Sequence, residues 1–244
     1  MKSEQADEDR MWWEKVGKTH KVNNFFELHE AFSRMSSGLE GIGRLFRGQS
    51  QFDWRLVPKS GRGSFAKANL RVYFNEWKQH AIEYLLNKPQ DELEWLAVAQ
   101  HHGFATNLLD WTYNPLAAAF FAVQEEINRD AAIIAYRPNC LVRPQVNPFT
   151  LEGVYAYQPT HVTQRIKRQM GAFTIHDPPT LSLDEYREEA KNLEIIIIDC
   201  SYKKQLLCDL ATYGVNQATL FPDLDGLSMH INWKMLNYVY PQAF

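Results

Sequence analysis

The chain is poor in cysteine and has no long uncharged run, and each shortage excludes a class of protein. Its 244 residues include three cysteines, Cys140, Cys200 and Cys208, with no C-x-x-C spacing, which argues against a disulfide scaffold and a zinc cluster and favours a reducing setting. The longest uncharged apolar block, residues 115–123, is far shorter than the roughly 20 residues that span a membrane. Because the first ten residues are polar and acidic, unlike a signal peptide, we predict a cytoplasmic protein with no membrane partner.

Several catalytic signatures are also missing. The sequence contains no G-x-S-x-G, no G-x-x-x-x-G-K-[ST] and no G-x-G-x-x-G, which excludes the usual hydrolase nucleophile and phosphate-binding loops. It also has no H-E-x-x-H and no evident metal-ligand triad, so we expect no metal. Basic and acidic residues number 26 and 29, a net charge of −3, which excludes a globally basic nucleic-acid coat.

The residues that are present predict a mixture of helices and strands. Apolar residues at helical spacing, together with an Asn-Pro pair that suits a helix start, predict helices over 25–35, 70–86, 91–102 and 115–123. Short apolar runs without alternation predict buried strands over 45–48, 131–136 and 193–198. Ser182 opens a capping box, and Ser201 is expected to cap a helix that ends at Gly214. We therefore predict an α+β fold with helices packed around a small mixed β-sheet.

The domain division that we expect is simple. Residues 1–22 form an N-terminal extension, and residues 23–244 form one domain, because no long linker or internal repeat interrupts them. The proline-punctuated stretch 137–159 is expected to be an irregular surface excursion.

One segment is strongly basic. Between Arg44 and Arg71, seven basic residues accompany a single acid, Asp53. The functional interpretation is a surface for phosphate groups, of a nucleotide or of a nucleic-acid backbone, and the alternative is an ordinary solvated surface. Arg47 favours the functional interpretation because it lies within an apolar strand, where a guanidinium needs an anionic partner.

A second segment, QHHGFATNLLDWTYNP at residues 100–115, concentrates histidine, acid and aromatic side chains between two predicted helices. Connections at helix ends often carry catalytic residues, and the following helix start offers unpaired N–H groups to an anion. The candidates here are His101 and Asp110. Because adjacent residues on a helix point apart, we expect at most one of His101 and His102 to face a site.

Four motifs in this order resemble the FRG domain family, which is named for its Phe-Arg-Gly triplet. They are residues 46–58 (FRGQ followed by WRLVP), 96–123, 165–173 (RIKRQMGAF) and 220–227 (LFPDLDGL). The resemblance extends from about Asn23 to the last predicted helix. FRG domains occur in bacteria and phages and are linked with toxin and antiviral-defence settings. The resemblance therefore implies a toxin-like protein, and a toxic activity implies a neutralising antitoxin as partner.

The order of residues is also similar to that of ADP-ribosyltransferases of the Arg-Ser-Glu type. Those enzymes carry an Arg on an early strand, a Ser-Thr-Ser strand that leads into an Ala-x-x-Phe helix, and then a Glu-bearing strand. Here Arg47 ends an early strand, residues 110–112 (DWT) lead into a helix with Ala117 and Phe120, and Gln169 precedes a third strand. Asp and Trp replace the first two residues of Ser-Thr-Ser, and the third site has no evident Glu.

This similarity implies NAD as co-substrate and RNA, DNA or protein as acceptor. Arg47, with the helix start after Asn114, would then bind the pyrophosphate. The nicotinamide would stack on Trp111 or Tyr113, and Thr112 and His101 would hold ribose hydroxyls. Asp110 or Gln169 would stabilise the developing cation or orient the acceptor. Structural alternatives remain for three of these residues: Trp111 in the core, Thr112 as a helix cap and Asp110 as the ion-pair partner of Arg47.

Two further functions compete with the transferase. One is a nuclease or other phosphate-handling enzyme built on His101, His102 and Asp110. The other is a non-catalytic sensor that binds a nucleotide or nucleic acid through the same residues.

Overall fold

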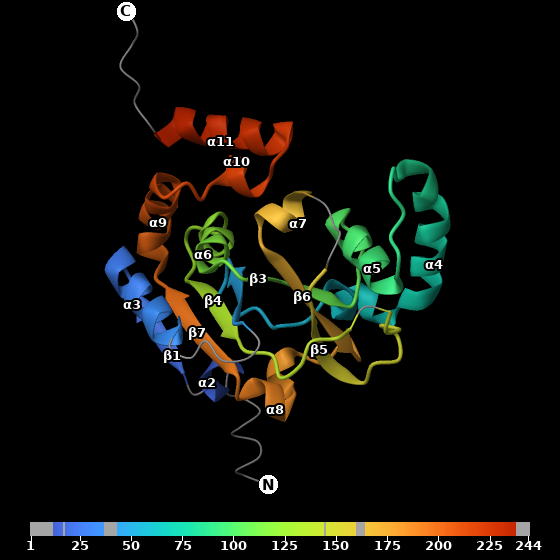
Figure 1. Ribbon diagram of the computed structural model, residues 1–244. Coiled ribbons are helices and arrows are strands. Elements are labelled where there is room, and N and C mark those ends of the chain that lie inside the picture. Colours follow the sequence, from blue (N-terminus) through green and yellow to red (C-terminus); the bar gives the residue numbers. More distant parts are fainter. Residues whose placement is uncertain (1–11, 17, 37–42, 144, 160–163, 238–244) are drawn as a thin grey trace, which may run out of the picture.

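Seven strands of the described chain form one mixed sheet, which confirms the predicted α+β class (Figure 1). The computed structural model describes residues 12–16, 18–36, 43–143, 145–159 and 164–237. In order across the sheet, the strands are β1 (Thr19–Val22), β7 (Leu193–Ile198), β4 (Ala131–Tyr136), β2 (Leu45–Gln49), β3 (Leu108–Thr112), β6 (Gly171–Asp177) and β5 (Gly153–Tyr157). β1 and β7 are parallel, and every other neighbouring pair is antiparallel.

The predicted strands 131–136 and 193–198 are central strands of the sheet. All six residues of β4 are buried, because β4 lies between β2 and β7 and has side chains packed on both faces. This burial explains why its sequence is continuously apolar rather than alternating.

The sheet opens between β2 and β3. β2 pairs with β4 along its whole length, and β3 pairs with β6 at five positions. β2 and β3 are joined by the single pair Phe46 and Thr112. Beyond that pair the two strands no longer form a ladder, so side chains of both strands can reach the space between them.

One face of the sheet is covered by the helices α3 (Phe25–Ser36), α6 (Pro115–Val123), α9 (Cys200–Thr212) and α10 (Gln217–Leu220). α6 crosses β2 so closely that a Cβ atom on Gly48 would lie 1.9 Å from the main-chain oxygen of Ala118. The glycine of the Phe-Arg-Gly triplet is therefore a packing requirement. The last described helix, α11 (Leu224–Asn237), lies above α10 (Figure 1).

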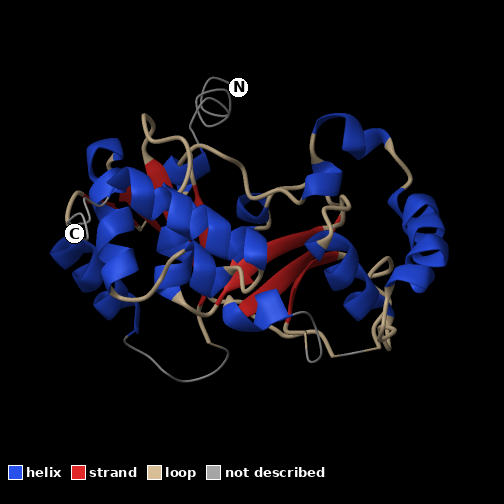
Figure 2. Cartoon of the chain, turned by 90° about the horizontal axis from the view of Figure 1, so that it is seen from above, coloured by secondary structure: helices blue, strands red, loops and turns tan. Residues whose placement is uncertain are grey.

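The opposite face packs on α2 (Trp12–Lys15) and on the chain around Leu56 and Leu183. A third cluster joins β3, β6 and β5 to α4 (Leu70–Ala81) and α5 (Glu92–His101). These two helices project to one side of the sheet (Figure 2). The described part of the chain contains no helix that combines the length and the apolarity needed to cross a bilayer.

The structure differs from the sequence predictions at several places. Asp199, not Ser201, caps α9, because its carboxylate accepts a hydrogen bond from the Ser201 main-chain nitrogen. Residues 108–112, expected in a connection, form strand β3. The proline-rich stretch contains the edge strand β5, and the helix predicted over 70–86 stops at Ala81 and continues as the 3-10 turn Ile82–Tyr84.

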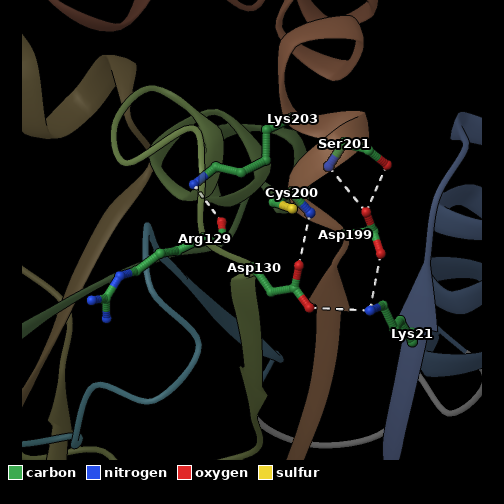
Figure 3. Close-up of polar contacts among 7 residues, drawn as sticks. All are labelled: Lys21, Arg129, Asp130, Asp199, Cys200, Ser201 and Lys203. Atoms are coloured by element: carbon green, nitrogen blue, oxygen red, sulfur yellow. Dashed lines mark hydrogen bonds and ion pairs between the residues drawn. The ribbon is translucent and has the colours of Figure 1, made fainter.

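Part of the expected N-terminal extension belongs to the domain. β1 pairs with β7, and Trp12 and Val16 are buried in the core. The ammonium group of Lys21 lies 2.9 Å from Asp199 and 3.1 Å from Asp130, and so fastens β1 to its neighbours (Figure 3). Residues 1–11 of that extension lie outside the described residues.

Candidate functional site

A cavity of about 330 Å³ lies where the sheet opens between β2 and β3. Residues of β2, β3 and β6 and of the helices α5, α6 and α7 (Gln164–Arg168) form its walls. The polar side chains that line it include Arg47, His101, Asp110, Thr112, Arg165 and Gln169. Its volume is at the lower end of the range of about 300–1,000 Å³ that is typical of small-molecule sites.

Arg47 places a half-buried positive charge in this cavity. Its Nη1 atom donates a hydrogen bond to the main-chain oxygen of Asp110 at 2.8 Å, and its Nε atom donates to Gln49 Oε1 at 3.3 Å. Burial lowers the pKa of Arg47 to about 10, and the nearby Asp110 carboxylate opposes that shift. Since this value is far above 7, the guanidinium is charged at neutral pH.

Asp110 lies across the opening from Arg47, as expected, but the hydrogen bond between the two residues does not use its carboxylate. The exposed side chain accepts a hydrogen bond from Gln100 Nε2 at 2.9 Å. The Gln100 side-chain oxygen in turn accepts from the Thr106 hydroxyl, which fixes the amide orientation. The carboxylate is thus held in place by a neutral donor and remains accessible.

Two more arginines lie within the electrostatic range of Asp110. Burial lowers the pKa values of both Arg62 and Arg165, and Asp110 opposes the shift in each. Arg47, Arg62 and Arg165 therefore approach one carboxylate from β2, from the segment after η1 (Lys59–Gly61), and from α7. Asp223 also acts on Arg165, and Glu125 lines the cavity beside Asp110. The three guanidinium groups converge on Asp110 and offer planar donors that suit an anionic ligand.

Of the two adjacent histidines, only His101 lines the cavity. Its half-buried position lowers its pKa, the neighbouring His102 and Arg165 lower it further, and Asp223 opposes the shift. The imidazole is therefore neutral at pH 7 and keeps one nitrogen as an acceptor. His102 is exposed, and its ring packs edge-on against His101 with the centroids 4.9 Å apart. The expectation that at most one of the pair faces the site agrees with this geometry.

Thr112 and Gln169 also line the cavity, and both are hydrogen-bonded to the scaffold. The Thr112 hydroxyl donates to the main-chain oxygen of Gln169 at 2.5 Å and accepts from the Asn114 main-chain nitrogen at 2.9 Å. The Gln169 amide nitrogen donates to the Leu220 main-chain oxygen at 3.1 Å. These bonds join β3, α7 and α10 around the cavity.

Trp111 is a core residue. Only 4% of it is exposed, and its Nε1 atom donates to the Thr174 hydroxyl at 2.9 Å. Its ring packs against Tyr136 with a centroid distance of 5.3 Å. Although Trp111 borders the cavity, its indole cannot stack on a ligand, so the structural alternative for this residue holds.

The start of α6 is not at the cavity, which corrects the predicted anion site there. The Asn114 side chain caps the helix by accepting from the nitrogens of Leu116 and Ala117. Tyr113 and Asn114, both in the described part of the chain, lie outside the cavity lining. The opposite end of α6 borders the cavity instead, through Gln124 and Glu125. The reason is that α6 crosses β2 at Gly48 and ends beside the opening.

Sequence reasoning missed how the two later motifs support the site. The Arg165 guanidinium lies 4.1 Å from the centroid of the Phe221 ring, and Phe221 also contacts Phe121 of the cavity wall. Asp223 caps α11 by accepting from the Gly226 nitrogen at 2.7 Å. The motifs 165–173 and 220–227 therefore pack together and hold Arg165 at the cavity.

A separate acidic group lies at the ends of β4 and β7. Among the described residues, Asp130, Asp199 and Cys200 are the group whose ligand atoms are near enough to share a metal, within 4.8 Å of one another. Lys21 bridges the two carboxylates (Figure 3), and none of these residues lines the cavity. An internal ammonium group thus already balances this cluster.

Comparison with known proteins identifies a family for part of the chain. The model of the FRG domain matches residues 43–131, which include β2, β3, α5 and α6 and most of the cavity between them. No curated protein and no solved structure shows significant similarity to the chain.

Proposed function

Because the chain contains an FRG domain at residues 43–131, with a cavity at its centre that is lined by Arg47 and Arg165, we propose that the protein is an NAD-dependent ADP-ribosyltransferase that modifies a macromolecule. The observation that carries the proposal is the half-buried guanidinium of Arg47 at the opening of the sheet, hydrogen-bonded to the strand that bears Asp110. A fixed positive charge beside an accessible carboxylate suits a substrate that combines a pyrophosphate with a ribose that becomes cationic.

Different residues of the cavity contact different parts of NAD. Arg47 and Arg165 bind the pyrophosphate, and the nicotinamide ribose lies against Asp110 and Thr112. Trp54, which lines the cavity and is 43% exposed, takes the stacking role that Trp111 cannot fill. The volume of about 330 Å³ encloses the nicotinamide half and leaves the adenosine at the open rim.

The reaction breaks the bond between C1′ of the ribose and N1 of nicotinamide. Both electrons leave with nitrogen, so nicotinamide departs neutral and C1′ acquires oxocarbenium character, as in glycoside cleavage. The Asp110 carboxylate stabilises that charge and accepts the proton that the acceptor oxygen or nitrogen loses as it bonds to C1′. Gln100 keeps the carboxylate oriented, and neutral His101 accepts a hydrogen bond from a ribose hydroxyl.

The test is incubation of the purified protein with NAD labelled in the adenylate phosphate and with cell lysate. The wild type is expected to label RNA, DNA or protein, and Arg47→Gln is expected to lose the label while keeping the wild-type circular dichroism and remaining folded at the assay temperature. Arg143→Gln, at an exposed arginine away from the cavity, is the matched control and should retain the label.

Three outcomes would overturn the proposal. Shortening of RNA without NAD would identify a nuclease, and saturable NAD binding without nicotinamide release would identify a sensor. Equal labelling by Arg47→Gln and the wild type would remove Arg47 from the site.

A toxin-like role follows if the transfer occurs in cells. Induced expression of the wild type should then arrest bacterial growth, and Arg47→Gln expressed at the same level should not. Co-expression of a neutralising antitoxin would restore growth. Equal growth of both strains would contradict the toxin role and leave the transferase assay as the test of chemistry.

A further inference from the structure

Four exposed basic residues follow one another along the chain from a point near the cavity, and the proposed reaction does not use them. They are here called the basic strip: Lys59 on η1, Arg62 between η1 and η2 (Gly63–Lys67), Lys67 at the end of η2 and Arg71 at the start of α4. No Asp or Glu occurs between Asp53 and Glu76. In a protein of net charge −3, this strip is a local concentration of positive charge without internal neutralisation.

Hydrogen bonds fasten the basic strip to the cavity rim. The Ser60 main-chain nitrogen donates to the Thr106 oxygen at 3.1 Å, and Lys59 Nζ donates to the Gly103 oxygen at 2.8 Å. Both acceptors belong to the connection that leads from His101 at the end of α5 to β3 and Asp110. The Lys59 end of the strip therefore holds a fixed position relative to the candidate catalytic carboxylate, and the strip extends from there through η2 to α4.

One residue of the strip, Arg62, interacts electrostatically with residues of the cavity. The charge of Arg62 lowers the pKa of Arg47, after the larger effect of burial, and Asp110 acts in turn on Arg62. Arg62 is thus the point at which the strip and the cavity meet.

Aromatic side chains accompany the basic ones. Phe65 is 49% exposed and Tyr73 is 54% exposed, and Trp54 is exposed at the cavity itself. The Lys59 ammonium lies 5.8 Å from the centroid of the Phe65 ring, so that ring is supported at the surface. Exposed aromatic rings among cationic groups that form no ion pair within the strip are the combination that binds single-stranded nucleic acid, through base stacking and phosphate contacts.

From this arrangement we infer that the basic strip binds a single strand of RNA or DNA and presents it to the cavity as the acceptor of ADP-ribose. The identity of the strand as acceptor rests on the proposed function, and the binding surface itself does not. The regularly spaced phosphates of a nucleic-acid strand are bound by a run of cations without intervening acids. Binding of a peptide acceptor does not require such a run.

The experiment measures binding without NAD. The full-length protein is titrated into fluorescein-labelled single-stranded RNA and DNA of about 20 nucleotides, longer than a site of about 4–16 nucleotides, and anisotropy is recorded between about 50 and 200 mM salt. The double variant Lys67→Glu/Arg71→Glu is compared with Lys204→Glu/Arg187→Glu, an equal charge change at exposed residues on α9 and α8 (Arg187–Ala190).

The wild type is expected to bind at low salt, and Lys67→Glu/Arg71→Glu should weaken binding at least about tenfold. It should also reduce the slope of log K against log salt by about 1–2, because phosphate contacts are lost. The control pair should bind within about twofold of the wild type. Equal losses in both variants would show a general charge effect and overturn the inference, as would absence of wild-type binding at low salt.

The outcome also separates this inference from the proposed function. Binding that depends on the strip, without transfer of label from NAD to the strand, would overturn the transferase and leave the surface standing. Labelling of protein with no binding of either oligonucleotide would overturn the surface and leave the transferase standing.

Discussion

The Nη1 atom of Arg47 donates a hydrogen bond to the main-chain oxygen of Asp110 over 2.8 Å. This bond joins β2 to β3 beyond the single residue pair that the two strands share. Because the acceptor is a main-chain atom, the bond does not depend on the Asp110 side chain. The carboxylate is therefore available for chemistry while the guanidinium supports the opening of the sheet.

The first prediction separates these two roles. Asp110→Asn keeps an oxygen for Gln100 Nε2 and leaves the main-chain bond to Arg47 intact, so the melting temperature should change by no more than about 2 °C. Loss of the carboxylate should slow nicotinamide release from NAD by at least about 100-fold. Asp53→Asn, at another exposed acid, is the control and should retain activity. An Asp110→Asn variant that is fully active, or one that fails to fold, would contradict the assignment.

The second prediction concerns the glycine of the Phe-Arg-Gly triplet. In Gly48→Ala the new Cβ would lie 1.9 Å from the Ala118 oxygen and 2.6 Å from the Ala122 nitrogen, so α6 must move off β2. We expect a loss of about 3 kcal/mol or more in the free energy of unfolding, measured by urea denaturation.

Gly103→Ala is the comparison for Gly48→Ala. Gly103 has open space around its Cα but a φ of +86°, so alanine there should cost only about 1–2 kcal/mol of backbone strain. Equal losses of stability in the two variants would mean that the close contact with α6 is not the reason why position 48 requires glycine.

The third prediction addresses the fully buried Lys203 on α9. Its ammonium donates to the main-chain oxygens of Ser50, Glu126 and Arg129, at 2.9, 2.7 and 3.2 Å (Figure 3 shows the last). These contacts hold the end of β2 against the connection after α6. Lys203→Met removes all three donors and should destabilise the protein by about 3 kcal/mol in urea denaturation.

The neighbouring Lys204 is exposed, and Lys204→Met should change the stability by no more than about 0.5 kcal/mol. If Lys203→Met were equally harmless, the three carbonyl contacts would have no energetic role.

The fourth prediction is a pH dependence of stability that originates at His176. This residue is fully buried, with Nε2 at 2.9 Å from the Thr174 hydroxyl. Burial lowers its pKa to about 3; a main-chain contact with Leu181 opposes the shift, and the Arg47 charge adds to it. The unfolded chain therefore takes up the proton first, near pH 6.5, and stability is lost as the pH falls from there towards 3.

One extra proton on the unfolded chain gives a slope of up to about 1.4 kcal/mol per pH unit. His176→Gln removes this contribution, so its unfolding free energy should fall less steeply than that of the wild type between pH 6.5 and 4. His80→Gln, at an exposed histidine, should follow the wild-type curve. Parallel curves for His176→Gln and the wild type would contradict the assignment.

Local patterns in the sequence predicted much of the fold. The continuous apolar run of β4, the isoleucine run of β7 and the Asn-Pro start of α6 are signals that a few residues carry by themselves, and the structure confirms them. Asp199 and Ser201 are both good helix caps, so the choice between them depended on how β7 leads into α9.

The site was predicted less completely, and β3 shows why. Side chains alternate between the two faces of a strand, so Asp110 and Thr112 share one face while Trp111 packs in the core on the other. The sequence predicts a connection for this segment, and a connection has no regular alternation of side chains. The sequence alone therefore could not tell which of Asp110, Trp111 and Thr112 face a ligand. Arg165 was missed as a site residue because its position depends on Phe221, about 50 residues further along the chain.

By itself, the sequence determined the α+β class, the buried strands and the need of Arg47 for a partner, because apolar patterning and a cation in an apolar strand are local properties. Only the tertiary structure decided where the cavity lies, which end of α6 borders it and which atom of Asp110 accepts the Arg47 hydrogen bond. Those features depend on the strands β2 and β3 parting after one residue pair and on a helix resting directly on Gly48, and both are contacts between segments far apart in the chain.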